Sequence, residues 1–527
     1  MRDFQSPGRS PVYATNGMVA TSHPLASEAA IACLRAGGNA ADAAVAAMAV
    51  AAVAEPHMVG IGGDCFALVS EPDGSIHGLN ASGRAPKAAD AERLRSRGIT
   101  TIGPDHVEAV TVPGAIRGFA ALLDRFGRFG LDTALSRAIE LAEKGVPVAP
   151  RVAHDWASLS PRLHRDAGAR RHLLPTGTAP RAGDIVRFPA LAATMRRIAG
   201  EGAEAFYAGP VAEDIVAAVA SHGGALTLED LAGAEAQWVE PVSRLYRGRE
   251  IVELPPNGQG AIALLILAIL ERFDLARHPM LSAERLHIEA EAARLAYGLR
   301  DAWLADPAFL ATPPAALFED GFVDGLARQI DPSRRNPALR AVPPPPSGTV
   351  YCAVADAEGR FVSLIASLFQ GFGSAIVAPE SGVTLHSRGT GFSLQAGHPN
   401  EYGPAKRPMH TIIPALMREG GRTIAAFGVM GGHYQALGHA HVVANMLDHG
   451  ADPQEAIDCP RLFFDADSIL VETAMPKSAA EGLVALGHDV KPAAGPFGGG
   501  QMVLADPARH LLIGASDPRK DGCALGF

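Results

Sequence analysis

The sequence predicts a compact fold of mixed helices and strands, and its composition supports this in two ways. Hydrophobic residues make up 48% of the 527 residues and charged residues 19%, a balance that can bury a large core and is not typical of a disordered chain. The 57 Gly and 40 Pro indicate many turns, which fits mixed α and β structure better than a helical array. Length alone suggests about three or four domains at roughly 150 residues each.

The first helices are expected between residues 27 and 54. This stretch is rich in Ala and is broken at Gly37-Gly38, with Asn39 and Asp42 at the restart, which predicts two closely packed helices. The glycine-rich run "GIGGD" (60–64) follows and leads into a strand, "CFALVS".

Helical patterns continue along the first two-thirds of the chain, at residues 115–126, 133–144, 189–200 and 210–221. Thr227 and Asp230 then predict a capping box at the start of another helix. A long amphipathic helix is expected at about residues 282–304. We interpret its three carboxylates as a solvated face rather than as an acid/base set; they are Glu284, Glu289 and Glu291.

The composition changes most sharply at residues 341–348, "AVPPPPSG". Four consecutive prolines favour an extended, exposed segment, so an interdomain linker is the simplest interpretation. Strand patterns begin directly after it. Residues 349–356 and 360–368, with the turn "AEG" between them, predict a β-hairpin.

Charge and hydropathy exclude several classes of protein. Lys plus Arg number 46 and Asp plus Glu 56, a net charge of −10, which disfavours binding to nucleic acid. The most apolar runs, 44–54 and 261–270, are shorter than the roughly 20 residues that cross a bilayer, so buried core helices are expected and no membrane association. Five scattered cysteines without a CxxC pair, and no apolar run at the N-terminus, predict a cytoplasmic protein.

Common metal, cofactor and nucleophile motifs are absent from the sequence. His439 and His441 are two residues apart in a helical stretch and point to different sides, so they make a poor chelating pair. "GIGGD" is not a dinucleotide-binding GxGxxG motif, and neither a GxSxG elbow nor a P-loop occurs. We therefore expect neither a metal nor a cofactor.

Thr349 is the first residue of the predicted hairpin and follows the proline run. A threonine hydroxyl is a weak nucleophile unless a base lies beside it, and a free α-amine on the same residue can be that base. This requires cleavage of the Gly348–Thr349 bond, for which a small Gly and an exposed proline-rich arm are suitable. By spacing alone, a Thr at the start of a strand is ordinary.

A second feature, in "RTIAAFGVMGGHYQALGHAHVVANML" (422–447), supports this hypothesis. A strand runs into Gly431-Gly432 and then into a helix, so backbone N–H groups at the junction can converge on one point. Such a turn can stabilise the oxyanion of a tetrahedral acyl intermediate, although it can equally be an ordinary tight turn. With Thr349, it indicates amide-bond chemistry.

The chain resembles the γ-glutamyltransferase family of N-terminal nucleophile hydrolases over essentially its whole length. Many ordered stretches carry the resemblance, among them "GGNAADAAVA" (37–46), "VPGAIRGF" (112–119), "LPPNGQG" (254–260), "FGSAIVAPESG" (372–382), "GPAKRP" (403–408), "GVMGGH" (428–433) and "ASDPR" (515–519).

The resemblance implies an α+β fold, a four-layer αββα sandwich made as one precursor and cut into a large and a small subunit. The large-subunit region would be residues 1–348 and the small one residues 349–527. By position, Thr349 matches the nucleophile, Ser367 an assisting hydroxyl, and Gly431 and Gly432 the oxyanion hole. The expected partners are a small amide substrate and the protein's own two fragments, and a homodimer of the processed unit is left open.

The positions that recognise a γ-glutamyl group in the family are altered. Val350 and Tyr351 replace the residues that usually follow the nucleophile, and Phe369 replaces an Asn. The carboxylate-binding Arg aligns with Ser82, two residues before Arg84, and residues 392–403, which carry a lid in transpeptidases, are short. Arg388 and Gly391 replace the Gln and Asp that hold the glutamyl amine, and His410 and Thr411 replace paired serines.

These changes predict a substrate with a carboxylate and no free α-amine, bound by Arg388, Arg84, His410 and Thr411. We therefore expect a self-processing N-terminal-threonine hydrolase of small carboxylate-bearing acyl amides. Two alternatives remain: a γ-glutamyl hydrolase or transpeptidase acting on glutathione-type substrates, and an inactive homologue that is never cleaved.

Overall fold

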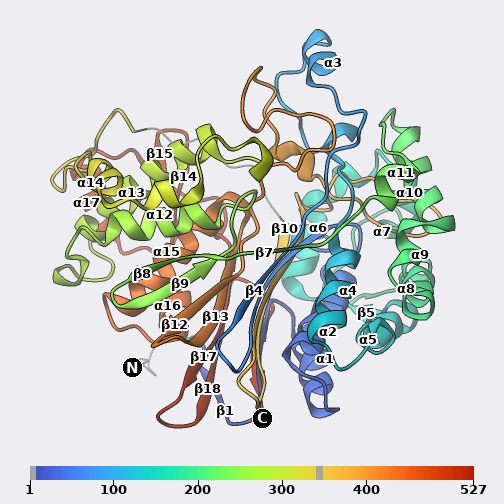
Figure 1. Ribbon diagram of the computed structural model, residues 1–527, viewed down its shortest axis with the longest axis horizontal. Coiled ribbons are helices and arrows are strands. Elements are labelled where there is room, and N and C mark those ends of the chain that lie inside the picture. Colours follow the sequence, from blue (N-terminus) through green and yellow to red (C-terminus); the bar gives the residue numbers. More distant parts are fainter. Residues whose placement is uncertain (1–7, 340–347) are drawn as a thin grey trace.

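Two stacked β-sheets form the centre of the protein in a computed structural model that describes residues 8–339 and 348–527. Each sheet has seven strands, and helices cover the outer face of each, so that the layers run helix, sheet, sheet, helix (Figure 1). The expected αββα arrangement is therefore present. The proline run at 341–347 lies outside the described residues.

The first sheet is antiparallel throughout and combines one strand from the N-terminal end with two from the middle of the chain and four from residues 415–516. In spatial order its strands are β1 (Val12–Ala14), β18 (Leu511–Ser516), β17 (Gly499–Asp506), β13 (Arg422–Met430), β12 (Ala415–Glu419), β9 (Arg249–Glu253) and β8 (Val242–Tyr246). Its outer face is covered by α12 (Gly260–Leu270), α13 (Ala283–Trp303), α14 (Asp320–Ala327), α15 (Gln435–Leu447), α16 (Pro453–Asp458) and α17 (Lys477–Ala485).

The second sheet is also antiparallel and holds the predicted hairpin at its centre. Its order is β19 (Cys523–Gly526), β2 (Met18–Thr21), β10 (Gly348–Ala355), β11 (Phe361–Phe369), β3 (Asp64–Ser70), β4 (Ile76–Ala81) and β7 (Gln237–Val239). The helices on its side are α1 (Pro24–Arg35), α2 (Ala40–Ala54), α4 (Ala115–Phe126), α5 (Leu131–Lys144), α6 (Pro150–Leu163), α7 (Ala167–Leu173), α8 (Pro189–Glu201), α9 (Glu204–Tyr207), α10 (Gly209–Ser221) and α11 (Leu228–Ala232).

Smaller elements complete the described chain. They are α3 (Ala91–Ser96), the pair β5 (Val146–Pro147) and β6 (Ile185–Val186), and a small sheet of β14 (Leu462–Asp465), β15 (Ser468–Val471) and β16 (Val490–Pro492).

Local sequence signals explain where the helices begin and end. The Asn39 side chain accepts hydrogen bonds at the start of α2, the expected restart, and Asp42 completes a capping box there. Thr227 and Asp230 do the same for α11. Every residue of α2 and α12 is buried, because α2 packs against the central hairpin and α12 lies between β8, β9 and its neighbouring helices.

The interpretation of Glu289 and Glu291 as a solvated face of α13 is wrong. Both are buried, and each forms an ion pair on its own helix, Glu289 with Arg285 and Glu291 with Arg294. Only Glu284 is exposed. The sequence pattern misleads here because a Glu paired with an Arg at helical spacing looks the same in the sequence whether the pair is buried or exposed.

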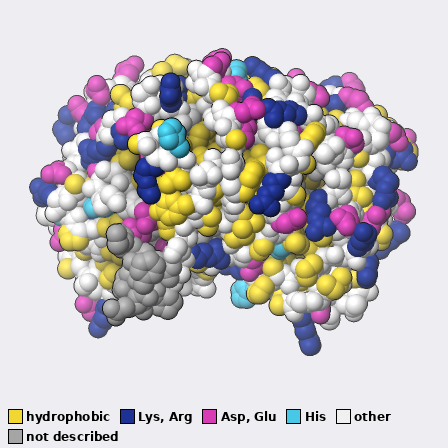
Figure 2. Space-filling model, turned by 90° about the horizontal axis from the view of Figure 1, so that it is seen from below, with side chains coloured by type: hydrophobic (Ala, Val, Ile, Leu, Met, Phe, Trp, Pro, Cys, Tyr) yellow, Lys and Arg dark blue, Asp and Glu magenta, His cyan; other side chains and the backbone are white. Residues whose placement is uncertain are grey.

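Both sheets contain strands from before and after residue 348, so the chain on the two sides of that residue is interleaved rather than divided into the three or four domains that length suggests. Positive and negative side chains are interspersed on the face that Figure 2 shows. Within the described ranges no helix combines the length and apolar character needed to cross a membrane.

Candidate active site

Thr349 lies at the start of β10 in an irregularity of the central hairpin. Gly348 pairs with Phe369 and Val350 with Ala366, so the register shifts between them, at Thr349. A bulge of this kind re-aims a side chain. The Thr349 hydroxyl is fully buried and lies 3.1 Å from the Ser367 hydroxyl on β11.

Ser367 is the most connected hydroxyl of the site. It donates to the Gly348 carbonyl at 2.6 Å, and accepts from the Phe369 N–H at 2.8 Å and from Arg388 Nη2 at 3.1 Å. A hydroxyl has one proton and two lone pairs. These three bonds therefore use its full capacity, and Thr349 Oγ1 touches Ser367 without receiving its proton while the chain is uncut.

Arg388 is fully buried beside Ser367. Its Nη1 donates to Thr411 Oγ1 at 2.9 Å, its guanidinium carbon lies 4.1 Å from the centre of the Phe369 ring, and its Nε has no hydrogen-bond partner among the described residues. Burial lowers the pKa of Arg388 to about 9, although nearby Asp64 acts in the opposite direction. The side chain is therefore still a cation at neutral pH.

Asp64 supplies the negative charge of this cluster. It begins β3, pairs with Ser367 in the sheet, and accepts hydrogen bonds from the Gly83 N–H and from His410 Nε2 at 3.1 Å each. His386 Nδ1 is 3.4 Å away and Arg388 Nε 3.9 Å away. Burial alone would raise the pKa of the Asp64 carboxyl, but the charge and hydrogen bonds around it outweigh burial and hold that pKa well below its usual value.

Of the four predicted substrate-binding residues, the structure brings three together. Arg388, His410 and Thr411 lie in the cluster with Asp64, and burial, reinforced by the charge of Arg388, lowers the pKa of His410 to about 3. Arg84 does not join them. It donates to the Ala405 carbonyl and pairs with Asp306 at 3.3 Å and Glu235 at 3.5 Å.

The Gly431-Gly432 turn lies at the end of β13, close to this site. Both residues have positive φ, 126° and 58°, a conformation that side-chain-bearing residues rarely adopt. The following His433 contacts the ring of Phe369, the partner of Gly348, with ring centres 6.1 Å apart. The turn is thus linked to the start of the hairpin through Phe369, and the role of the two glycines as an oxyanion hole stays a prediction.

Hydrogen bonds at the turn use its carbonyl groups. Tyr434 N donates to the Gly431 carbonyl and Gln259 Nε2 to the Gly432 carbonyl, while Arg300 Nη1 contacts both Gln259 Oε1 and His433 Nδ1. Among the described residues the Gly431 N–H finds no acceptor. A donor fixed in this way is available to a developing oxyanion.

Sequence reasoning missed Asp64, His386, Gln259 and Arg300 as members of the site. Asp64 and Gln259 fall within the stretches "GIGGDCF" and "LPPNGQG" that carry the family resemblance, so those motifs were the available signal. Arg300 falls within a further stretch of this kind, "EAARLAYGLRDAWLADPAF" (291–309). His386 carries no such signal, because only contacts between distant segments bring it to the centre.

One group of side chains elsewhere has ligand atoms close enough to hold a metal, His287, Glu291 and His488. His287 Nδ1 and His488 Nε2 are hydrogen-bonded at 2.7 Å, and Glu291 is bonded to Arg294. The group is therefore a hydrogen-bonded network. His439 and His441 bind different carboxylates, Glu253 and Glu289, as their spacing predicts.

The two stacked sheets and the hydroxyl pair at the start of the central hairpin define a protein of the N-terminal nucleophile hydrolase fold. The chain belongs to the gamma-glutamyltranspeptidase family, whose family model matches residues 26–527. The fold and the family expected from the sequence are thus confirmed.

Three similar proteins have related names. The chain is 35% identical to the glutathione hydrolase-like YwrD proenzyme of Bacillus subtilis, covering 98% of this chain and 99% of the relative. It is 35% identical to the oxamate amidohydrolase proenzyme of Klebsiella pneumoniae, covering 97% and 99%. The crystal structure of cephalosporin acylase from Bacillus halodurans superposes with a TM-score of 0.93 at 39% identity, covering 100% of this chain and 99% of that one. The protein is a gamma-glutamyltransferase-like amidohydrolase.

Proposed function

We propose that this protein is a self-processing N-terminal-threonine amidohydrolase acting on small carboxylate-bearing acyl amides. The contact that carries the proposal is the one between Thr349 Oγ1 and Ser367 Oγ, at 3.1 Å, with Ser367 also bonded to the carbonyl of the bond to be cut.

Processing begins in the uncut chain. The Ser367 hydroxyl polarises the Gly348 carbonyl, which favours attack by Thr349 Oγ1 on that carbon. The C–N bond then breaks, the acyl group moves to oxygen, and the hydroxyl proton passes to the Thr349 nitrogen. Water hydrolyses the ester, leaving a free Thr349 α-amine. The word "proenzyme" in the names of two relatives supports this step.

After processing, the same groups serve the substrate. The departure of Gly348 releases the Ser367 proton, which can turn to Thr349 Oγ1 and orient it. The Thr349 amine takes the hydroxyl proton as Oγ1 attacks, and returns it to the leaving nitrogen. The N–H groups of Gly431 and Gly432 stabilise the oxyanion, and water releases the acid.

Ser367→Ala tests this double role of the serine. We expect slower cleavage of the precursor and, in protein that has been cleaved, a kcat lower by about 10- to 1000-fold, the range for loss of one positioned hydrogen bond or oxyanion donor. Cleavage is followed on denaturing gels and turnover in the cleaved fraction. Ser363→Ala, on the same strand, is the control. An unchanged kcat in cleaved Ser367→Ala protein would remove this residue from the mechanism.

The carboxylate preference rests on Arg388. Its Nη2 and Thr349 Oγ1 each lie 3.1 Å from Ser367 Oγ. A substrate with its carboxylate on the guanidinium therefore needs only a short spacer between that carboxylate and the carbonyl that Thr349 attacks. Guanidinium and carboxylate pair strongly and can pair bidentately. An outward-facing Arg388 paired with Glu380 or Glu401 is not observed, since these glutamates pair with Arg171 and Arg95. A relative named oxamate amidohydrolase supports the same class of substrate.

Three chromogenic anilides that differ only in the acyl group test the preference. Glutaryl-p-nitroanilide has a carboxylate, pentanoyl-p-nitroanilide lacks it, and γ-glutamyl-p-nitroanilide adds an ammonium. We expect wild type to prefer the glutaryl compound, and Arg388→Met to lose about 10- to 100-fold in kcat/KM on it while changing little on the pentanoyl compound.

Preference of wild type for the γ-glutamyl compound would favour the second candidate function, a γ-glutamyl hydrolase. The name of the Bacillus subtilis relative supports that candidate. If wild type is not cleaved and hydrolyses none of the three anilides, the protein is an inactive homologue.

A further inference from the structure

A cavity of about 400 Å³ lies beside the Gly431 turn. Its lining has an aromatic wall, formed by Tyr434, Phe463 and Phe497, and a polar wall. The polar wall is made by His57, Arg151, Asp155 and Lys520. A cavity of this size and mixed character can hold a small amphipathic molecule.

The cavity lies next to the bond that Thr349 is proposed to cut, because two of its lining residues contact Gly348. His57 and Met58 line it, and a Cβ placed on Gly348 would lie 2.9 Å from the His57 carbonyl and 3.2 Å from the Met58 Cα. None of Asp64, Arg388, His410 and Thr411 lines it. The cavity and the Arg388 cluster therefore consist of different residues, and both lie near the proposed nucleophile.

Lys520 provides a charge in the cavity without a partner. The residue is 9% exposed, and its Nζ forms no hydrogen bond or ion pair with any described residue. By contrast, Arg151 and Asp155 are bonded to each other at 2.8 Å, and His57 lies 3.4 Å from Asp155. Burial lowers the pKa of Lys520, as expected for an ammonium without a close counter-ion. Asp465, the other carboxylate of the lining, is exposed, so water screens its charge.

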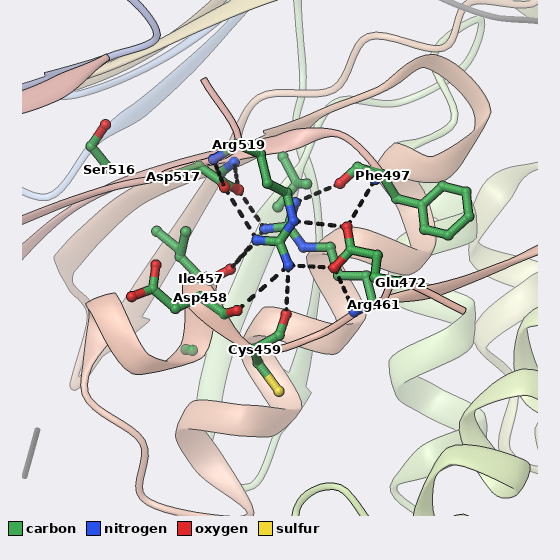
Figure 3. A network of polar contacts seen from close by, with 12 residues as sticks. Ile457, Asp458, Cys459, Arg461, Glu472, Phe497, Ser516, Asp517 and Arg519 are labelled. Carbon is green, nitrogen blue, oxygen red and sulfur yellow. Dashed lines mark hydrogen bonds and ion pairs between the residues drawn. The ribbon is translucent and has the colours of Figure 1, made fainter. Parts of the chain in front are cut away.

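A network of buried ion pairs, shown in Figure 3, fixes Asp517 and Arg519 in the segment that precedes Lys520. Asp517 pairs with Arg461 at 2.7 Å, and Arg519 pairs with Glu472 at 2.5 Å. Arg461 and Glu472 also bond the backbone of Phe497, which belongs to the aromatic wall. The network thus holds the ammonium-bearing segment and Phe497 of the aromatic wall in a fixed relation, as a preorganised binding site requires.

We infer that this cavity is the leaving-group subsite, and that Lys520 binds an anionic group on the amine half of the substrate. The inference rests on the proposed function, which places the acyl half at Arg388. The two halves of an amide extend in opposite directions from its carbonyl, so the amine half enters the surroundings that the acyl half does not use. An amine with an apolar body and a carboxylate fits a cavity lined by aromatic rings and an unpaired ammonium.

Four amides that combine two acyl groups with two amines test the inference. The acyl groups are glutaryl and pentanoyl, and the amines are p-aminobenzoate and aniline, so the carboxylate is present on either half, both or neither. In Lys520→Met, we expect kcat/KM to fall about 10- to 100-fold on both p-aminobenzoate compounds and less than about threefold on both anilides. Lys520→Arg should restore most of the loss. Lys477→Met removes the same charge from an exposed position and is the matched control.

Binding of free p-aminobenzoate to cleaved wild type and Lys520→Met, measured by calorimetry, gives a readout that does not depend on turnover. Weaker binding to the variant supports the subsite even if none of the four amides is a substrate, an outcome that would count against the proposed function alone. Equal binding, or equal loss on anilides and p-aminobenzoates, overturns the inference. A loss that follows the glutaryl group instead would assign Lys520 to the acyl half and also overturn it.

Discussion

Thr349→Ala is expected to remain a single 54.7 kDa chain and to have no detectable amidase activity. Wild type should yield fragments of about 36 and 19 kDa, because the same hydroxyl is proposed to cut the Gly348–Thr349 bond and then to attack substrate. Since one atom serves both reactions, loss of activity should be at least about 10⁴-fold, comparable to removal of a nucleophile elsewhere. Denaturing gels and turnover of the preferred anilide measure the two effects.

Thr349→Ser is the matched variant, since it keeps the hydroxyl and loses only a methyl group. It should be cleaved and retain measurable activity. The mechanism is wrong if wild type stays full length after prolonged incubation and is nevertheless active, or if Thr349→Ala is cut at the same place.

Asp64→Asn is expected to lower the free energy of unfolding by about 3–5 kcal/mol, the typical cost of leaving a buried charge without its partner. The substitution keeps the size of the side chain but removes the charge that balances buried Arg388. Asp64 also accepts a hydrogen bond from the His410 N–H, and an Asn amide group can instead place its own N–H donors against that N–H. Thermal and denaturant unfolding should be compared in the Thr349→Ala background, where the chain is continuous.

The loss of unfolding free energy in Asp64→Asn should depend on pH. The folded-state pKa of Asp64 is depressed, so its contribution is complete above the unfolded pKa of about 4 and declines as pH falls below it. The difference between parent and variant should therefore be constant near neutrality and shrink in acid. Adding Arg388→Met to Asp64→Asn should recover part of the stability. Asp73→Asn, in an exposed turn, is the control, and an equal midpoint for Asp64→Asn and its parent would contradict this role.

Much of the fold could be predicted because local signals determine it. The break at Gly37-Gly38, the capping box at Asn39 and the hairpin after residue 348 all depend on residues that are close in sequence. The burial of Glu289 could not be predicted in this way. Its ion pair with Arg285 lies within α13, but its contact with His441 arises only when side chains of α13 and α15 meet, a contact between distant segments.

In the candidate site too, local contacts could be predicted and contacts between distant segments could not. The contact of Thr349 with Ser367 follows from hairpin pairing and could be anticipated. The charge balance of Arg388 could not, because Asp64 reaches it through β3, a strand nearly 300 residues earlier in the chain that pairs with β11. Arg84 shows the limit of alignment by position, since its preferred partners, Asp306 and Glu235, come from segments that sequence spacing does not bring together.

The interleaving of strands from both sides of residue 348 has a consequence for the stability of the protein after the proposed cleavage. The precursor can unfold and refold as one chain, an equilibrium that does not depend on its concentration. Once the bond is cut, the two fragments still share both sheets, and full unfolding also separates them, so refolding becomes an encounter of two molecules. Proteolysis would thus convert a reversible folding problem into one of assembly. The mature enzyme would then persist because it unfolds slowly rather than because it refolds readily.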